Sequence, residues 1–292
     1  MARIAIVGPG AIGGAIALWL EKTGRHDVTL CARRPLAELC LDTPRGRLTA
    51  RLQVLTEPAA AQPVDCVMVA TKAYQAVATA AWLPALVTPD TTVAILQNGV
   101  EHRERFSPYV PAEQILPVMV GISAERPEPT RILQRGATRM TVPDDARGRN
   151  FAALFSDTPV EVTRTADFKT AIWRKLCGNS AGAINALLLQ PTHVMHDERI
   201  GELTREIVRE CIAVGRAEGA ILDDSVAEAV LTGMRNAPPD SINSMQADRL
   251  ERRPMEIDAR NGVIVRLGHK HGIPTPCNRM AVALLEALER AG

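Results

Sequence analysis

Three glycines near the start of the chain have the spacing of a phosphate-binding turn. Gly8, Gly10 and Gly13 follow an apolar run at residues 4–7 and precede an apolar helical pattern. In such a unit the first glycine makes the turn, the second lets a pyrophosphate approach the backbone, and the third lets the helix lie close to the strand. N–H groups at the helix start then favour an anion. The predicted dinucleotide-binding residues are Gly8, Pro9, Gly10, Ala11, Ile12 and Gly13.

This stretch has two other possible interpretations. A glycine-rich turn can exist without a ligand, and a basic residue before an apolar run can belong to a secretory signal. The position of the turn, between a strand and a helix, favours nucleotide binding. The apolar run is interrupted at residues 8–10 and continues into Glu21 and Lys22 without a small-residue cleavage site, which argues against a signal.

Two arginines follow the second predicted strand, at residues 27–32. NAD sites commonly place an acidic residue about twenty positions after the glycines, whereas an arginine there can hold a 2′-phosphate. Asp27 lies at the wrong end of the strand for the acidic role. Arg33 and Arg34 could form only a solvated loop, but their position favours NADP over NAD. Arg33 is the predicted contact because it comes first after the strand.

Polar residues also follow the next predicted strands, at residues 64–70 and 91–96. Residues just past the carboxyl ends of parallel strands face the ligand crevice of a doubly wound sheet. Lys72 is therefore predicted to meet a phosphate, a ribose or a substrate carboxylate. Asn98 is predicted to contact nicotinamide or substrate, although an Asn-Gly pair can also be only a turn.

In the second half of the chain, Lys175 and Asn179 are four residues apart, so both project from one face of a predicted helix. Gly178 and Gly182 lie in the same helix, where each glycine costs about 1 kcal/mol relative to alanine. That cost predicts that something packs against the backbone there, and a neighbouring helix is the simplest candidate. Because a helical lysine is usually solvated, the spacing alone does not assign Lys175 to a reaction.

Two further polar stretches, residues 241–245 and 256–262, occur in this half. Asn243 and Ser244 stand at a predicted helix start, where capping is the simplest role. Glu256 could be a surface charge, yet it opens a strongly polar run in a helix that is otherwise apolar.

Composition limits the classes of partner. The 292 residues carry a net charge of +1 and are 46% apolar and 3% aromatic, which argues against nucleic-acid and acidic membrane surfaces. No apolar run reaches the roughly 18 to 20 residues that span a bilayer. Six separated cysteines without a CxxC pair predict a reduced, cytoplasmic protein. The histidines lack a third ligand for a metal ion, so no metal site is predicted.

The order of predicted elements gives the fold class. Strands and helices alternate up to about residue 165, which predicts a parallel sheet covered on both faces. The rest is helical. We therefore predict an α/β protein with a Rossmann-type doubly wound sheet at residues 1–166 and an all-helical domain at residues 167–292. The later helices are predicted at residues 168–189, 198–218, 225–234, 244–251, 255–271 and 278–290.

Taken together, six motifs resemble the ketopantoate reductases, also called 2-dehydropantoate 2-reductases, over nearly the whole chain. They are GPGAIG at 8–13, ATKAYQ at 70–75, LQNGVE at 96–101, WRKLCGN at 173–179, SMQAD at 244–248 and EIDARNG at 256–262. The resemblance implies hydride transfer from NADPH to the keto carbon of 2-dehydropantoate, giving pantoate for pantothenate synthesis.

The same resemblance implies the role of each site residue. Lys175 would hydrogen-bond the ketone and supply the proton as the alkoxide develops, since an ammonium stabilises and neutralises that charge. Glu256 would bind a substrate hydroxyl, and Asn179 and Ser244 would hold other polar groups of the substrate.

In the first domain, Lys72 and Asn98 would lie near the ribose, the nicotinamide and the substrate carboxylate. The glycines and Arg33 would hold NADP. The resemblance thus implies that groups from both domains take part in the reaction.

Two positions depart from the family pattern. Ala183 and Ser241 stand where many relatives have asparagine, with Asn185 and Asn243 nearby. A reductase of another 2-keto acid is therefore the first alternative. A protein that senses NADPH without turnover is the second, although it would need neither Lys175 nor Glu256. Apolar helical faces could also pair two copies as a homodimer.

Overall fold

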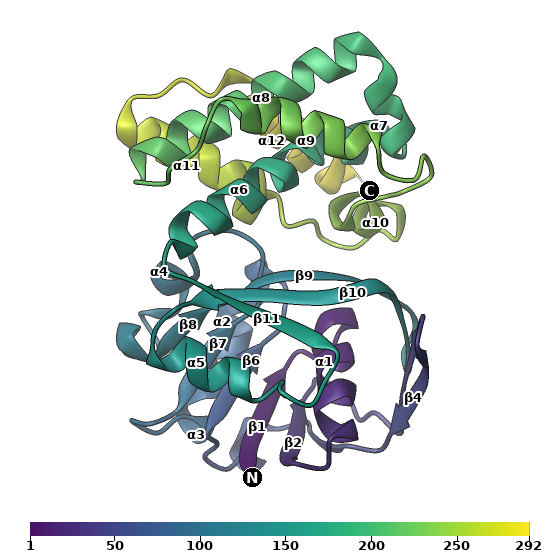
Figure 1. Cartoon of the computed structure of the whole chain (residues 1–292), viewed down its shortest axis with the longest axis vertical. Helices are drawn as coiled ribbons and strands as arrows, with labels where there is room; N and C mark the ends of the chain where they lie inside the picture. The colour runs from purple at the N-terminus through teal and green to yellow at the C-terminus, as the bar shows by residue number, and fades with distance from the viewer. Residues whose placement is uncertain (292) are drawn as a thin grey trace. The chain divides into compact units, whose positions relative to one another are not determined.

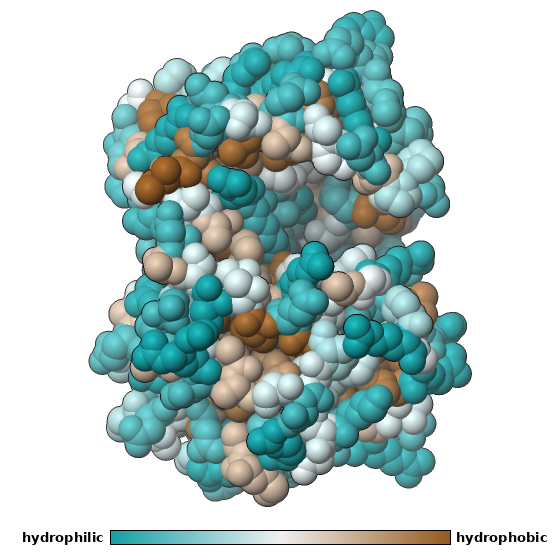
Figure 2. All heavy atoms as spheres, in the orientation of Figure 1, coloured by the Kyte–Doolittle hydropathy of each residue, from teal (hydrophilic) through white to brown (hydrophobic). Residues whose placement is uncertain are grey.

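The computed structural model describes residues 1–291. The chain divides into two compact units, Met1–Phe168 and Lys169–Gly292. The first unit contains all the described strands, and the second is helical (Figure 1). On the face drawn in Figure 2, hydrophilic residues predominate and apolar residues form scattered patches.

The main sheet of the first unit has six parallel strands in the order β5-β2-β1-β6-β7-β8. This is the Rossmann order, in which the chain reverses direction across the sheet beside β1. The predicted fold class is therefore confirmed. The strands are β1 (Ala2–Val7), β2 (His26–Cys31), β5 (Gln53–Leu55), β6 (Cys66–Val69), β7 (Thr92–Ile95) and β8 (Ile115–Pro117).

Both faces of this sheet are covered because its central strands are apolar on both sides. In β1, Ile4 and Ile6 belong to the core that includes helix α1 (Ala11–Lys22). Ala5 and Val7 belong to the opposite core. The opposite face carries α2 (Ala76–Ala80), α3 (Leu83–Leu86) and α4 (His102–Phe106), with short 3-10 turns η1 (Pro58–Ala60), η2 (Ala73–Gln75) and η3 (Ala112–Gln114).

The alanine-rich composition of the stretch that ends at Leu86 predicts one helix, and this prediction is wrong. It consists of η2, α2 and α3. Pro84 occupies the first turn of α3, where its missing N–H costs nothing, but it could not continue a helix from α2.

A second sheet was not predicted. Its five strands run in the order β11-β10-β3-β4, and β9 pairs with β10. The sheet is mixed, because β10 is parallel to β3 and β11 but antiparallel to β9. The sequence also predicts strands at residues 115–122 and 138–142 as part of one parallel sheet, and their assignment to a single sheet is wrong. The strands are β3 (Leu39–Thr43), β4 (Gly46–Ala50), β9 (Met119–Glu128), β10 (Arg131–Pro143) and β11 (Val160–Thr165).

Helix α1 packs against both sheets, so their inner faces share one core. A β-carbon on Gly14 would lie 2.4 Å from Cδ1 of Ile132, which shows how closely β10 approaches this helix. Buried and exposed positions alternate along much of β10, as expected for a sheet that buries one face. Helix α5 (Ala146–Ala153) connects β10 to β11, and Asp145 caps its first turn by accepting from the Gly148 N–H at 2.7 Å.

The second unit is helical throughout its described residues, as predicted. Two of its predicted helices are interrupted. The helix predicted at 168–189 breaks at Gly182, and the one predicted at 255–271 contains a π-turn. The elements are α6 (Phe168–Ala181), α7 (Ala183–Leu188), η4 (Thr192–His196), α8 (Glu198–Ala217), α9 (Ser225–Arg235), α10 (Ser244–Leu250), the π-turn η5 (Asp258–Gly262), α11 (Val263–His271) and α12 (Pro276–Ala291).

Across residues 1–291, every helix is too short or too polar to cross a membrane.

Candidate functional site

The glycine turn between β1 and α1 is shaped by close backbone packing. Gly8 has a φ of +86°, and a β-carbon there would lie 2.5 Å from Cγ2 of Thr71. At Gly13 a β-carbon would lie 2.6 Å from the Gly8 carbonyl oxygen. Only glycine fits these two positions without displacing Thr71 or the turn itself.

Gly10 differs from its neighbours because the space beside it is open, with no atom within 4 Å of an added β-carbon. It is the N-cap of α1, and no side chain caps that helix end. The N–H groups in the first turn of α1 therefore lack a side-chain acceptor. This arrangement suits the close approach of a phosphate, and the binding itself stays a prediction.

Arg33 and Arg34 lie just past the end of β2, and both are exposed. The end of β2 is tied to the glycine turn, because the Gly8 N–H donates to the Cys31 carbonyl at 3.1 Å. Arg33 is therefore two residues beyond Cys31, whose carbonyl accepts the hydrogen bond from the glycine turn.

The ends of β6 and β7 meet at the same edge of the sheet, and Gln97 connects them. Its amide nitrogen donates to Oγ1 of Thr71 at 3.0 Å and to the Lys72 carbonyl at 3.1 Å. Lys72 precedes η2, and its N–H donates to the side chain of Gln75 at 3.2 Å. Asn98 directly follows Gln97. The predicted residues Lys72 and Asn98 are therefore brought to neighbouring strand ends.

Gln97 was missed by the sequence analysis. Its side-chain oxygen also accepts from Arg105 at 3.2 Å, and its carbonyl bonds the ring of buried His102 at 2.8 Å. Gln97 directly follows a predicted strand, and an amide side chain at such a strand end is a signal that could have identified it as a candidate site residue.

The second unit contains a cluster of charged and polar side chains on α6, α10 and the π-turn. Lys175 and Asn179 lie on α6 and are half-buried, with Trp173, Leu176 and Cys177 buried beside them. Burial and, to a smaller extent, the charge of Arg260 lower the pKa of Lys175, Glu256 opposes both effects, and the resulting pKa is about 8. A lysine with such a pKa can give up a proton near neutral pH.

Arg260 is the buried centre of this cluster and is 2% exposed. Its Nε donates to the Asn179 carbonyl at 3.2 Å, and a terminal nitrogen donates to Oγ of Ser244 at 3.3 Å. Burial lowers the pKa of Arg260 to about 10, while Glu256 and Asp248 raise it. The guanidinium of Arg260 thus connects the π-turn to α6 and to α10.

Arg260 was not assigned a role from the sequence, although it stands in the polar run 256–262 that was singled out. The π-turn widens the helix here, and such turns are frequent at functional sites. Glu256 precedes the π-turn and is 5% exposed, so it is not the surface charge that was considered.

The capping role considered for two residues belongs to Asn243. Its side-chain oxygen accepts from the N–H groups of Met245 and Gln246 at 3.0 and 3.1 Å. Ser244 is the first residue of α10, is exposed, and accepts from Arg260.

Gly178 in α6 and Gly182, which lies between α6 and α7, have different surroundings. A β-carbon on Gly182 would lie 2.8 Å from a terminal nitrogen of Arg260 and 3.0 Å from Nδ2 of Asn243. Close packing was predicted there and is confirmed. At Gly178 the same prediction is wrong, because the space beside this exposed residue is open.

Ala183, one of the two positions that depart from the family pattern, and its neighbour Asn185 both have structural contacts. Ala183 is fully buried in an apolar cluster with Met245, Met255 and Ile257. Asn185 donates to the Gln190 carbonyl at 3.0 Å and so holds the end of α7.

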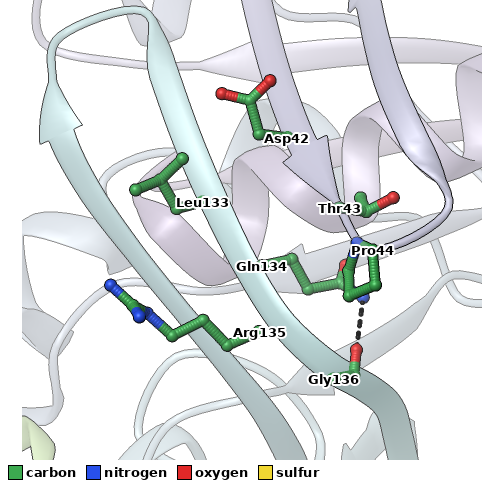
Figure 3. A pocket seen from close by; sticks show the side chains of 7 residues that line it. All are labelled: Asp42, Thr43, Pro44, Leu133, Gln134, Arg135 and Gly136. Atoms are coloured by element: carbon green, nitrogen blue, oxygen red, sulfur yellow. Dashed lines mark hydrogen bonds between the residues drawn. The ribbon is translucent and has the colours of Figure 1, made fainter.

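A surface hollow of about 500 Å³ lies elsewhere, on the second sheet of the first unit (Figure 3). Arg47 and Arg131 donate to its Asp42 at 2.6 and 2.8 Å and hold the pKa of that carboxyl near 2. Its lining residues are Asp42, Thr43, Pro44, Leu133, Gln134, Arg135 and Gly136, and none of them was predicted as a site residue. Within residues 1–291 no three His, Cys, Asp or Glu side chains are grouped to hold a metal ion.

Comparison with known families gives two matches. The family described as "Ketopantoate reductase PanE/ApbA" matches residues 4–147, and the one described as "Ketopantoate reductase PanE/ApbA C terminal" matches residues 167–289.

Similar proteins cover almost the entire chain. A 2-dehydropantoate 2-reductase from Caulobacter vibrioides is 51% identical over 287 residues, which is 98% of this chain and 99% of that protein. The crystal structure of 2-dehydropantoate 2-reductase from Geobacter metallireducens has a TM-score of 0.92 at 29% identity, covering 98% of this chain and 99% of its own. A dimeric ketopantoate reductase from Staphylococcus aureus has a TM-score of 0.89 at 26% identity, covering 99% of each chain.

Proposed function

The chain belongs to the ketopantoate reductase family, a family of oxidoreductases, and from this premise we propose that it reduces 2-dehydropantoate to pantoate with NADPH. The observation that carries the proposal is the cluster in the second unit, where Lys175 has a pKa lowered to about 8 beside Glu256 and Arg260. The product would serve pantothenate biosynthesis.

NADPH would supply the hydride to the C2 ketone of the substrate. The protonated amine of Lys175 would donate a hydrogen bond to the ketone oxygen. As negative charge develops on that oxygen, the amine would transfer its proton and leave a neutral lysine. Partial burial makes this transfer easier, because it disfavours the ammonium form.

The other residues of the cluster would hold the substrate. Glu256 would accept a hydrogen bond from a substrate hydroxyl, while Asn179 and Ser244 would bind its remaining polar groups. Arg260 is buried behind them, and its bonds to the Asn179 carbonyl and to Ser244 fix their positions. Arg260 would therefore act as a positioning residue.

The first unit would bind the dinucleotide, with residues 1–166 as the NADP domain and residues 167–292 as the substrate domain. The open space at Gly10 and the uncapped start of α1 fit the pyrophosphate. Arg33 favours NADP over NAD, because it follows the strand end that is tied to the glycine turn. Lys72 and Asn98 would face the ribose, the nicotinamide or the substrate carboxylate.

A reduction of another 2-keto acid on the same scaffold is the second candidate. It is favoured by Ala183, whose buried methyl group offers no hydrogen bond to a substrate hydroxyl. A sensor without turnover is the least favoured alternative, because burying a lysine lowers stability and binding alone does not require it.

We also propose a homodimer in the cytoplasm. The dimeric relative from Staphylococcus aureus supports association of two copies. Met280, Leu284 and Leu288 form an exposed apolar stripe on α12, spaced four residues apart, that could be covered by a second copy. All six cysteines are free thiols, which suits a reducing compartment.

A panel of keto acids tests the proposal. The protein is mixed with NADPH and either 2-dehydropantoate, pyruvate or a bulkier 2-keto acid, and the loss of absorbance at 340 nm is followed. We expect the highest kcat/KM with 2-dehydropantoate. A higher value with another keto acid would favour the second candidate, and NADPH binding without oxidation of any substrate would favour the sensor.

A further inference from the structure

Arg126, on β9, reaches the glycine turn from the second sheet. One terminal nitrogen of its guanidinium donates to the Pro9 carbonyl, inside the turn. The other donates to the Pro129 carbonyl, in the connection between β9 and β10. The cationic end of this side chain therefore lies directly beside the residues that begin α1.

The charge of Arg126 is not compensated within the described residues. The side chain is half-buried, and its Nε is buried without a hydrogen-bond partner. Burial is the cause that lowers its pKa, and no carboxylate of residues 1–291 forms an ion pair with it. A partly buried cation held only by carbonyl groups is costly, because those groups do not replace a counter-ion.

Three other arginines on the same sheet form ion pairs with carboxylates. Arg131 pairs with Asp42 at 2.8 Å, Arg135 with Glu125 at 2.6 Å, and Arg139 with Glu161 at 3.0 Å. Arg135 and Arg139 are exposed and Arg131 is half-buried, and each of the three has a carboxylate partner. Arg126 is also half-buried, yet the partners of its guanidinium are neutral carbonyl groups.

We propose that Arg126 is a dinucleotide-binding residue whose guanidinium provides the counter-charge to the pyrophosphate at the glycine turn. The inference rests on the proposed use of a pyridine nucleotide. A guanidinium has parallel donors that match two phosphate oxygens, and Arg126 would present them next to the uncapped N–H groups of α1. The bond to Pro9 would hold the turn and the guanidinium in one arrangement.

This role differs from the one proposed for Arg33. The pyrophosphate is common to NADPH, NADH and ADP-ribose, whereas only NADPH carries the 2′-phosphate. Loss of Arg126 should therefore weaken all three ligands by a similar factor. Loss of Arg33 should weaken NADPH alone.

The test is calorimetric titration of the full chain with NADPH, NADH and ADP-ribose. For Arg126→Met we expect each Kd to rise about 10- to 100-fold, the range for a charge-assisted hydrogen bond. Arg126→Lys should recover part of the loss because it keeps the charge. Arg139→Met is the matched control, since it removes an exposed arginine of the same sheet, and its Kd values should be unchanged.

Thermal unfolding without ligand separates binding from a structural role. We expect Arg126→Met to unfold within a few degrees of the wild type, because the substitution removes a poorly compensated charge along with two hydrogen bonds. Unchanged Kd values, or a loss confined to NADPH, would overturn the inference. So would a large fall in Tm that accounts for weaker binding and is not relieved in Arg126→Lys.

Failure of the proposed function gives a different result. If the wild-type protein bound none of the three ligands, both proposals would fall. If it bound them and reduced no keto acid, the proposed reaction alone would fall, because ADP-ribose and NADH binding still report on Arg126.

Discussion

The glycine turn of the first unit and the charged cluster of the second unit are built on opposite principles. In the turn, Gly8 and Gly13 leave no room for a side chain, and the groups offered to a ligand are backbone N–H groups. In the cluster, the groups proposed for the reaction are the side chains of Lys175 and Glu256, which lie within the electrostatic influence of buried Arg260. The first site depends on close packing and the second on desolvated charge.

This difference determines which substitutions damage each site. A turn made by close packing is damaged by adding one methyl group, since the backbone has nowhere to move. A charged cluster tolerates added bulk better than the loss of a charge, because the remaining buried charges lose their partner. Substitutions that add a methyl group or remove a charge therefore test the comparison directly.

The largest effect is expected at Lys175. Lys175→Ala should lower kcat by roughly 10² to 10⁴, the usual contribution of a general acid, while the Kd of NADPH stays near the wild-type value. Steady-state assays and a binding titration measure the two quantities. Lys169→Ala is the control, because Lys169 lies on the same helix and donates to the Glu218 carbonyl. Equal kcat values for Lys175→Ala and the wild type would remove Lys175 from the chemistry.

Gly8→Ala and Gly10→Ala should separate packing from binding in the turn. Gly8→Ala should lower the free energy of unfolding by about 2–4 kcal/mol, because it combines a positive φ with a close contact to Thr71. Gly10→Ala should change it by less than about 0.5 kcal/mol and weaken NADPH binding. Urea unfolding and calorimetry measure the pair. Similar stability losses in both variants would contradict the packing account.

Arg33→Ala tests the proposed selectivity for NADP. Losing a charge-assisted hydrogen bond to the 2′-phosphate should raise the Kd of NADPH about 10- to 100-fold and leave that of NADH nearly unchanged. The neighbouring variant Arg34→Ala should have little effect on either. If both cofactors were weakened equally by Arg33→Ala, the 2′-phosphate assignment would be wrong.

The smallest effect is expected in α6 and α7, where two glycines have different surroundings. Gly178→Ala should raise the free energy of unfolding by up to about 1 kcal/mol, because the space beside it is open and alanine favours a helix. Gly182→Ala should give no such gain, since its β-carbon would press on Arg260. Chemical unfolding measures the change in the free energy of unfolding in both variants. A gain at Gly182 equal to that at Gly178 would show that the Arg260 contact is unimportant.

Local patterns predicted the first site better than the second. Short-range spacing predicts the glycine turn, the strands around it and the helical character of the residues after 168. The fold class predicted on that basis is confirmed. The pairing of β10 with β3 was missed because it joins residues about ninety positions apart, as Ile132 with Leu41. Spacing along a strand predicts its buried face but not its partner.

Two arginines, Arg260 and Arg126, were assigned no role from the sequence. Arg260 stands in a motif that was singled out, but its burial depends on a π-turn and on contacts with α6 and α10. Arg126 lies near Pro127 and Pro129, which favour a connection over a strand, and nothing in its neighbours indicates a contact with Pro9, 117 residues away. Both proposed roles depend on tertiary contacts that no local pattern encodes.

The pH dependence of kcat/KM for reduction of 2-dehydropantoate tests the central claim most directly, namely that Lys175 is the proton donor. Because burial and Arg260 lower the pKa of Lys175 to about 8, kcat/KM should be constant below this pH and fall tenfold per unit above it, as the amine loses its proton. Lys175→Arg keeps its proton at these pH values, so its lower rate should show no such fall. A wild-type rate that stayed constant to pH 10, or the same fall in Lys175→Arg, would contradict the account.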